Sequence, residues 1–215
     1  MDWHDVADLP FSAVLEPHRG GLSVHGNYDG VHFDRLSLDE PQAASSRFIE
    51  CALTGVTVQG GRLQRARFSD VFLQDVRLVS TALGETQWTD VTFDRSAAAG
   101  VEMYGAELRR VTFRGCKLDS VNFRGAELTE VTFDDCDLRD VDFAGATLTR
   151  SAFGGSRLAR ADLTGTSLDE ADLRGAELGL IIDKNSLSGA IVSTGQLVAI
   201  APVLAETMGI TVRDD

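Results

Sequence analysis

Histidine and cysteine side chains are the groups with which this sequence could perform metal or nucleophilic chemistry. Its four histidines are His4, His18, His25 and His32, and all of them precede the regular part of the chain. A metal site would need cysteines or carboxylates at ligand spacing around these imidazoles. We find no such arrangement, and no Ser/His/Asp or Cys/His constellation for nucleophilic catalysis. The sequence therefore predicts a protein that is not an enzyme and has no catalytic, metal or cofactor-binding residues.

Cysteine content and charge narrow the class of protein further. The three cysteines form an odd and sparse set, which is typical of a reducing compartment and makes a poor disulfide framework. The N-terminal residues lack the basic segment and apolar run of a signal peptide, and no apolar stretch approaches the roughly 20 residues of a membrane span. With a formal net charge of −13, direct binding of nucleic acid is unexpected. We expect a cytoplasmic protein.

A step of five residues organises the middle of the chain. Every fifth residue from Phe33 to Leu178 is apolar, and the register never slips within residues 31–180. Two residues before each of these lies a small or β-branched residue in most pentads, and two residues after them glycine recurs. Examples of the small column are Cys51, Val71, Val91, Val111, Cys116, Val121, Ala126, Val131, Cys136 and Val141. A period of five fits neither an α-helix nor a flat strand.

A chain that turns a corner every five residues would bury both columns. Four corners close one coil of 20 residues, and glycine at the third position of each turn suits the positive φ that such a turn requires. The sequence therefore predicts an all-β solenoid, a right-handed quadrilateral parallel β-helix, over residues 31–180. Residues 20 apart should stack, so we expect a ladder of Phe93, Phe113, Phe133 and Phe153, faced by Phe123 and Phe143. Cys116 and Cys136 should be buried, inert thiols on one wall.

Three pentads depart from the pattern. Pro41 and Gly61 occupy small-residue positions, and Ala98 occupies a large one. We expect local looseness there, and no break in the rod.

The two ends lack the regular repeat. Residues 1–30 form a lead-in segment, in which Leu22 and Val24 could pair with the first coil. In residues 181–215, Ser193 and Gln196 have the spacing of a capping box, and Gly209 suits the end of the helix. Four apolar residues follow at helical spacing: Leu197, Ile200, Leu204 and Met208. We expect a kink or break at Pro202 and a short strand at Ile210 and Val212.

The pentads from Cys116 to Arg150 and from Ala161 to Leu180, such as ADLTG and ADLRG, resemble the A(D/N)LXX pattern of the pentapeptide-repeat family. The resemblance implies a quadrilateral β-helix without catalytic residues. Bacterial members resembling this chain dimerise through a C-terminal module, so residues 181–215 are either a homodimer contact or only a cap. A hexapeptide-type acyltransferase is excluded by the five-residue step and by the absence of histidine after His32.

The resemblance also implies a partner. The best understood members of the family are acidic rods that mimic DNA, bind type II topoisomerase such as gyrase, and protect it from quinolones or toxins. Here residues 31–180 hold 24 acidic and 17 basic residues, so their net charge is −7. Spread over a rod of ~36 Å, this net charge gives about a third of the charge density of B-DNA. Uniform mimicry is therefore excluded, and mimicry along one wall is the remaining form.

The wall that runs from Phe48 to Leu168 has the largest net charge, −3, and one column on it carries five acidic residues spaced by one coil. They are Glu50, Asp70, Asp90, Glu130 and Glu170, and the column also holds Arg110 and Arg150. A basic cluster at Arg62, Arg65 and Arg67 does not favour mimicry. Two hypotheses remain: a one-wall DNA mimic that binds gyrase, or a scaffold for an unknown protein partner.

Overall fold

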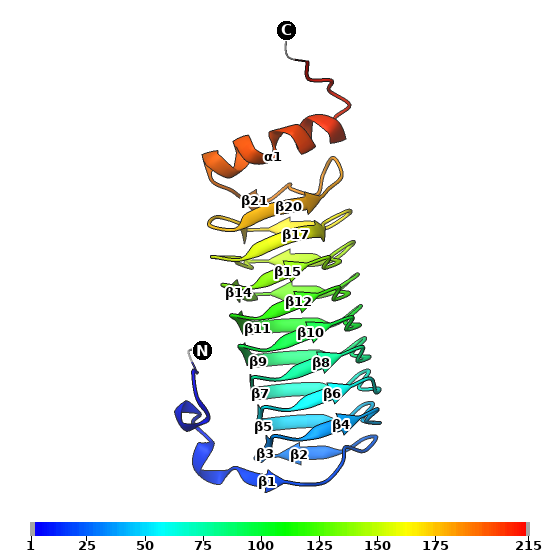
Figure 1. The fold of residues 1–215 in the computed structure, drawn as a ribbon, viewed down its shortest axis with the longest axis vertical. Helices are drawn as coiled ribbons and strands as arrows, with labels where there is room; N and C mark the ends of the chain where they lie inside the picture. Colours follow the sequence, from blue (N-terminus) through cyan, green and yellow to red (C-terminus); the bar gives the residue numbers. More distant parts are fainter. Residues whose placement is uncertain (1–2, 214–215) are drawn as a thin grey trace.

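The computed structural model describes residues 3–213, which form one parallel β-solenoid with a helix across its C-terminal end (Figure 1). Strand pairs join residues 20 apart in neighbouring coils, as Phe93 lies beside Phe113 and Phe113 beside Phe133. The predicted fold class, an all-β parallel solenoid with a C-terminal helical cap, is confirmed. We name its four walls by their first inward residues: Phe33, Leu38, Ala43 and Phe48.

One sheet covers two walls. In its central strands, eight residues run without interruption from the Phe48 wall onto the Phe33 wall. The strands are β1 (Glu16–His18), β2 (Asn27–Asp29), β3 (Val31–Asp34), β5 (Arg47–Thr54), β7 (Arg67–Gln74), β9 (Gln87–Asp94), β11 (Glu107–Arg114), β13 (Glu127–Thr129), β14 (Thr132–Asp134), β16 (Thr147–Thr149) and β18 (Ser167–Asp169).

The other two walls are less alike. An eight-stranded sheet forms the Leu38 wall, whereas the Ala43 wall is joined by single parallel bridges such as Gln42 to Arg62. The sheet contains β4 (Ser37–Asp39), β6 (Thr57–Gln59), β8 (Arg77–Val79), β10 (Ala97–Ala99), β12 (Lys117–Asp119), β15 (Asp137–Arg139), β17 (Arg157–Asp162) and β20 (Glu177–Ile181). A last short pair joins β19 (Ala171–Asp172) to β21 (Ala190–Ile191).

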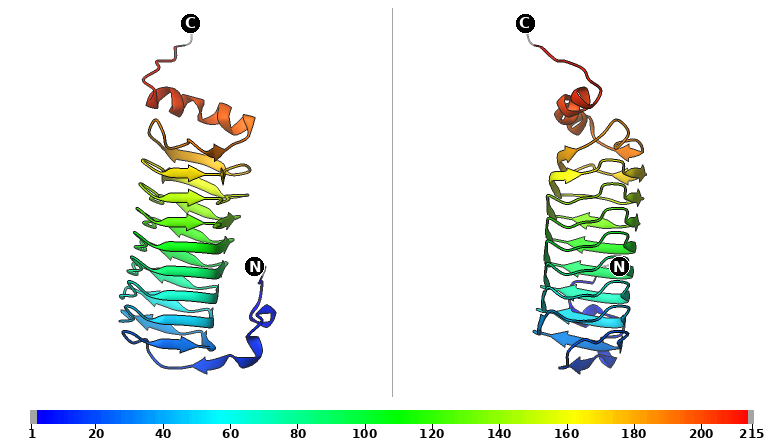
Figure 2. Two further views of the ribbon diagram at one scale, coloured as in Figure 1. Left: turned by 180° about the vertical axis from the view of Figure 1, so that it is seen from behind. Right: turned by 90° about the vertical axis from the view of Figure 1, so that its right-hand side faces the viewer.

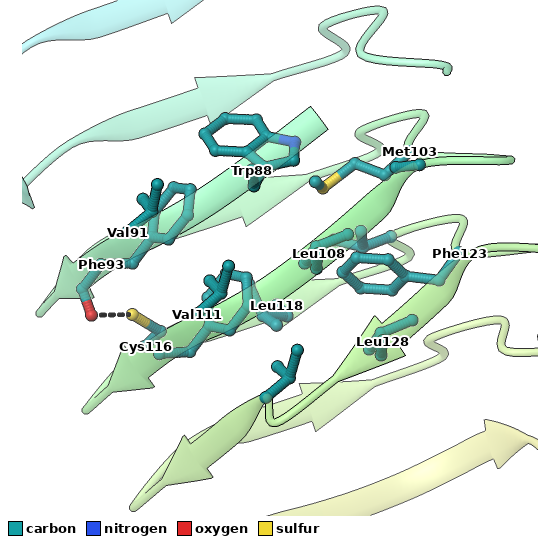
Figure 3. Close-up of a cluster of buried hydrophobic side chains, with 14 of the residues drawn as sticks. Trp88, Val91, Phe93, Met103, Leu108, Val111, Cys116, Leu118, Phe123 and Leu128 are labelled. Carbon is teal, nitrogen blue, oxygen red and sulfur yellow. Dashed lines mark hydrogen bonds between the residues drawn. The ribbon is translucent and has the colours of Figure 1, made fainter. Parts of the chain in front are cut away.

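Aromatic and aliphatic side chains fill the interior, so the channel is a core (Figure 3). The predicted ladder is confirmed: successive rings from Phe93 to Phe153 are stacked with centroids 4.7, 4.9 and 4.8 Å apart. Phe123 and Phe143 stack at 5.3 Å. A further ladder, not singled out in the sequence, consists of Tyr28, Phe48, Phe68 and Trp88. Stacking at this spacing follows from the inter-coil distance of ~4.8 Å.

The three irregular pentads are accommodated without a break. Pro41 and Gly61 lie in adjacent coils, and a Cβ on Gly61 would lie 2.5 Å from Cδ of Pro41. Gly61 therefore makes the room that the proline ring of the preceding coil needs. Ala98 remains within β10, which pairs with β8 and β12, and a small cavity of about 20 Å³ beside it reflects its missing side-chain volume.

The N-terminal segment joins the solenoid earlier than the regular pentads do. β1 pairs with β3, and β2 pairs with β5. Tyr28, five residues before Phe33, is buried in the core, and the ring of His18 contacts those of Tyr28 and Phe33. Of the two residues expected to cover the first coil, Leu22 packs against the core and Val24 is 50% exposed.

Residues 3–15 form a strap that lies along the outside of the Phe33 wall (Figures 1 and 2). It contains two short 3-10 helices, η1 (Val6–Asp8) and η2 (Ser12–Val14). A second apolar cluster, outside the channel, holds the strap: Trp3, Leu9 and Phe11 pack with Ala52 and Phe72 of the wall. Nε2 of Gln74 donates to the carbonyl of His4 at 2.8 Å, and Nη1 of Arg114 donates to that of Trp3 at 3.1 Å.

The coil at the C-terminal end is one residue shorter than the others. Ala171 pairs with Ala190, and a register shift occurs where β20 pairs with β17. Ile182, Leu187 and Val192 pack against the core, so the inward series steps by four residues after Leu178 and then by five again. The parallel ladder thus continues past residue 180.

One helix, α1 (Thr194–Thr207), closes this end. The capping box of Ser193 and Gln196 is confirmed, and Gly209 at φ +71 ends the helix. The amide of Ile210 donates to the carbonyl of Ala205, which completes a Schellman motif. Each helix in residues 3–213 is too short or too polar to span a membrane.

A break at Pro202 and a strand at Ile210 and Val212 are both absent from the described part of this end. The helix continues through Pro202 without a break, and residues 209–213 form no strand. Proline removes the donor that the carbonyl of Val198 would receive. Since Val198 is 70% exposed, water can bind that carbonyl, and the helix survives.

Candidate interaction surfaces

The acidic column of the Phe48 wall lies on a corner of the rod. Its five acidic members have φ between +49 and +56, the left-handed conformation expected at the third position of each turn. Because strands on this wall pair with a shift of 20 residues, the column places one side chain per coil. The column is therefore real as a geometric feature, and its members project from an edge instead of from a flat face.

Arginines within the same column neutralise part of this charge. Nε and Nη2 of Arg110 donate to the carboxylate of Asp90, and Nη2 of Arg150 donates to Glu130 at 2.8 Å. The hydrogen bond from Arg150 holds the pKa of Glu130 below its usual range. Burial, together with the charges of Asp90 and Glu50, raises the pKa of Asp70. Glu50 and Glu170 remain exposed and have no ion pair within residues 3–213.

The same pairing recurs on the other corners. Arg65 pairs with Glu85 at 3.1 Å and Arg95 with Asp75 at 3.3 Å, and Arg160 pairs with Asp140. In each case the partner is 20 residues away and so lies in the adjacent coil. Exposed ion pairs of this kind contribute little to stability. Their main consequence is that acidic and basic corner residues cancel each other's field, which the sequence-based charge count of each wall could not reveal.

Exposed carboxylates also line the other edge of the Phe48 wall, where Nε2 of Gln87 donates to Glu107 at 3.2 Å. Glu107 and Glu127 begin β11 and β13, pair with each other across neighbouring coils, and are exposed. Neither forms an ion pair within the described part of the chain. Together with Glu50 and Glu170, they give this wall carboxylates along both edges. Neither Glu107 nor Glu127 was among the predicted partner-binding residues, because that prediction used a single column of the wall.

The burial and hydrogen bonds of the cysteines agree with a structural role. Cys51, Cys116 and Cys136 are free and buried, and Cys116 donates from Sγ to the carbonyl of Phe93 (Figure 3). Burial raises the pKa of Cys51 to about 11, and the hydrogen bond with Cys116 together with burial raises that of Cys136. In residues 3–213, no group of three histidine, cysteine or carboxylate side chains is placed to hold a metal ion.

Helix α1 divides the four predicted cap or dimer residues into two pairs. Ile200 is 4% exposed and Leu204 is half-buried, so these two face the rod. Leu197 and Met208 are 49% and 67% exposed. Gln196 adds two hydrogen bonds between the helix and the solenoid: its Nε2 donates to the carbonyls of Leu173 and Ala176 at 2.6 and 2.8 Å. The cap and the exposed apolar surface thus use different residues of one helix.

Comparison with protein families finds a match: the sequence model of the family described as pentapeptide repeat region matches residues 86–163. Among solved structures, HetL from the cyanobacterium Nostoc, described as involved in heterocyst differentiation regulation, is 20% identical, with a TM-score of 0.46 over 80% of this chain and 91% of HetL. A trypsin-treated form of QnrB1, a plasmid-mediated fluoroquinolone resistance protein, is 16% identical, with a TM-score of 0.40 over 88% and 100%. A thylakoid-lumen protein from Arabidopsis thaliana is 24% identical, with a TM-score of 0.36 over 51% and 85%. No curated protein matches the sequence.

Proposed function

Because this chain carries a pentapeptide repeat region, we propose that it is a non-enzymatic interaction protein whose acidic Phe48 wall binds a basic surface of a protein partner. The observation that carries the proposal is the pair of carboxylate-bearing edges on that wall. Glu50, Glu107, Glu127 and Glu170 are exposed there without ion-pair partners in residues 3–213. Partial mimicry of DNA at a type II topoisomerase such as gyrase is the specific form that the family resemblance implies.

The internal ion pairs refine which residues would carry such a contact. Asp90 and Glu130 already bind arginines of their own column, and a partner would have to break those pairs to use them. Glu50 and Glu170 need no such exchange. The strap covers the Phe33 wall beside Phe72, which leaves the Phe48 wall as the more accessible acidic surface. A generic scaffold for another protein remains the alternative function.

A charge-reversal experiment with gyrase tests the proposal. One variant carries Glu50→Lys, Glu127→Lys and Glu170→Lys. Its control carries Asp39→Lys, Asp119→Lys and Asp135→Lys, at exposed carboxylates off the Phe48 wall. Both sets change the net charge by the same amount. Purified gyrase, relaxed plasmid and ATP report supercoiling, with and without a quinolone.

We expect wild type and the control set to inhibit or protect gyrase and the Phe48-wall set to do neither. Added salt should weaken the effect of wild type, because opposite charges carry the contact. If wild type leaves gyrase unaffected at micromolar concentration, the topoisomerase proposal fails and the scaffold alternative replaces it. Equal loss in both sets would show that total charge matters and the wall does not.

We also propose that helix α1 forms a homodimer contact. A helix that is apolar on all sides is normally buried, and Glu206 is the single charged residue of α1. Yet Leu197, Val198 and Met208 are 49%, 70% and 67% exposed. A second copy of the same helix would cover this surface and would continue the rod beyond its last coil.

Light scattering tests the dimer. Leu197→Asp with Met208→Asp should give a monomer with the melting temperature that the full chain has at high dilution, because both side chains are exposed on the single chain. Thr194→Asp with Thr211→Asp, at two exposed positions of the same C-terminal segment, serves as the control. A monomeric wild type would overturn the dimer proposal and leave the helix as a cap only.

A further inference from the structure

The Ala43 wall has a hollow in its N-terminal half. Its outward residues Ala44, Ala82 and Gly84 are small, so the surface is recessed between longer neighbours. Two adjoining recesses of about 660 and 370 Å³ share Arg62 and Gln64 as lining residues. The smaller one, which we call the Tyr104 hollow, is lined by Ala44, Ser45, Arg62, Gln64, Arg65, Glu85 and Tyr104.

A tyrosine is held in place at one side of this hollow. Tyr104 lies one coil after Gly84, and a Cβ on Gly84 would lie 2.4 Å from Cζ of the tyrosine ring. The absence of a side chain at Gly84 therefore lets the ring rest directly on the backbone. Tyr104 is still 41% exposed, so part of the ring is available to a ligand. Rigid tyrosines supply contact area at low cost in conformational entropy, and they are common in binding sites.

Arginines gather around the same place in an otherwise acidic chain. Arg62 and Arg65 line the Tyr104 hollow, and Arg47 and Arg67 lie just past the corner that Arg65 occupies. Arg65 bonds Glu85 at 3.1 Å. Arg47, Arg62 and Arg67 are exposed and have no ion pair within residues 3–213. The chain has a net charge of −13. This arginine group therefore makes a locally positive patch on a negatively charged protein.

We propose that the Tyr104 hollow is a second docking site, which binds an acidic, extended segment of a protein partner. A carboxylate of that segment pairs with Arg62, and a flat or apolar side chain next to it packs on Tyr104. From Ala44 to Tyr104 the hollow crosses three coil spacings, ~14 Å, which is the length of about four extended residues. The hollow itself lies on the Ala43 wall and borders the N-terminal part of the Phe48 wall, where Arg47 and Arg67 begin β5 and β7. It would bind a surface opposite in charge to the one that the acidic column would bind.

Charge argues for a peptide over a nucleic acid. The arginines attract only the few ligand charges that lie inside the hollow. The rod as a whole is negative, because residues 31–180 hold 24 acidic and 17 basic residues. It therefore repels any polyanion that extends beyond the hollow. A short peptide can place its one or two carboxylates beside Arg62, which lines the hollow, and no charge elsewhere on the rod. A short acidic peptide is therefore attracted by the arginines of the hollow and stays clear of the negative charge on the rest of the rod.

Nuclear magnetic resonance titration at low salt tests the site with three probes. They are a capped pentapeptide of alternating glutamate and phenylalanine, its lysine and phenylalanine counterpart, and a pentathymidine oligonucleotide. We expect only the glutamate peptide to shift the amide signals of Gln64, Gly84 and Tyr104. Arg62→Glu should weaken its binding about tenfold or more, because attraction becomes repulsion at contact distance.

Two further variants separate the contributions of charge and shape. Gly84→Ala should also weaken binding, since the new methyl group displaces the Tyr104 ring without any change in charge. Arg77→Glu, an exposed arginine on the Leu38 wall, makes the same charge change elsewhere and should have little effect. Absence of shifts with the glutamate peptide would overturn the proposal. So would equal weakening by Arg62→Glu and Arg77→Glu, and tighter binding of the oligonucleotide would assign the hollow to nucleic acid.

Discussion

Left-handed backbone at the corners is the main conformational demand on single residues of this fold. Twenty non-glycine residues within 3–213 have φ between +44 and +59. This conformation is unfavourable for residues with a Cβ, by roughly 1–2 kcal/mol each. The solenoid can impose it because inter-coil hydrogen bonds, such as the one from the amide of Ser120 to the carbonyl of Arg139, hold most corners in place.

Changing a corner residue to glycine should therefore stabilise the rod. Ser120, at φ +54, is exposed, and its hydroxyl bonds only Asp119 among the described side chains. We expect Ser120→Gly to raise the free energy of unfolding by about 0.5–1 kcal/mol, after allowance for the extra flexibility of glycine in the unfolded chain. Gly125→Ala, at φ +62 with open space around the glycine, should lower it by a similar amount. Denaturant titration measures both, and equal signs for the two changes would contradict the argument.

The inward residues are constrained in a different way, because each must supply an apolar side chain of sufficient volume. Phe133 has no exposed surface, and its ring stacks between Phe113 and Phe153. Phe133→Asp would bury an unpaired charge in an apolar channel, and we expect the fold to be lost. Asp134→Ser, at the next residue on the exposed side, should change the free energy of unfolding by less than about 0.5 kcal/mol. Thermal melts of the two variants decide, and similar melting temperatures would be incompatible with the five-residue register.

At the scale of elements, the strap is an addition that the repeat does not require. The strap covers one outward column of the Phe33 wall. Neighbouring coils have a small or polar residue in this column, as at Ala52 and Thr92, but one coil has Phe72. The rings of Trp3 and Phe11 pack over Phe72 and contact each other edge to face, with their centroids 5.9 Å apart. Sequence reading could have noticed Phe72 as an apolar residue at an outward position, which is a signal that something covers it.

Phe72→Ala should release the strap while the solenoid stays folded. The change removes the centre of the second apolar cluster, which is outside the channel. In a Trp88→Phe background, Trp3 is the one remaining tryptophan, so its emission should shift to the red as the indole meets water. The far-ultraviolet circular dichroism should remain that of the parent. An unchanged emission maximum would mean that the strap is held by its hydrogen bonds to Gln74 and Arg114 alone.

How far the elements could be predicted depended on how strictly each kept to the five-residue period. Thirty pentads in residues 31–180 defined the walls and the ladder, because the residue at every fifth position, from Phe33 to Leu178, pointed inward. Past Leu178 a single missing residue shifted the series to Ile182 and concealed the last coil. The corner ion pairs could have been found, since Arg110 and Asp90 are 20 apart. The strap was unpredictable from the period, because it contacts the rod through side chains and carries no repeat itself.

At the scale of the whole molecule, the C-terminal helix protects the last edge of a long parallel stack. Without it, β20, β21 and the half-buried Ile182, Leu187 and Val192 would face water, and unpaired strand edges promote association. Deletion of residues 193–215 should therefore give aggregates, or a monomer with a lower melting temperature. Gln196→Ala is the milder test of the same element. It leaves the carbonyls of Leu173 and Ala176 without the donor that α1 supplies and should cost about 1–3 kcal/mol.

Light scattering and thermal melting of both variants separate the cap from the proposed dimer contact. If α1 is both, Gln196→Ala loosens the helix from the rod and lowers the melting temperature, while the truncation in addition removes the contact between copies. If α1 is only a dimer contact, the truncated chain is a stable monomer with the melting temperature of the full chain at high dilution. A truncated chain that keeps both the particle stoichiometry and the melting temperature of the full chain would show that neither role belongs to this helix, and the exposed Leu197 and Met208 would then need another explanation.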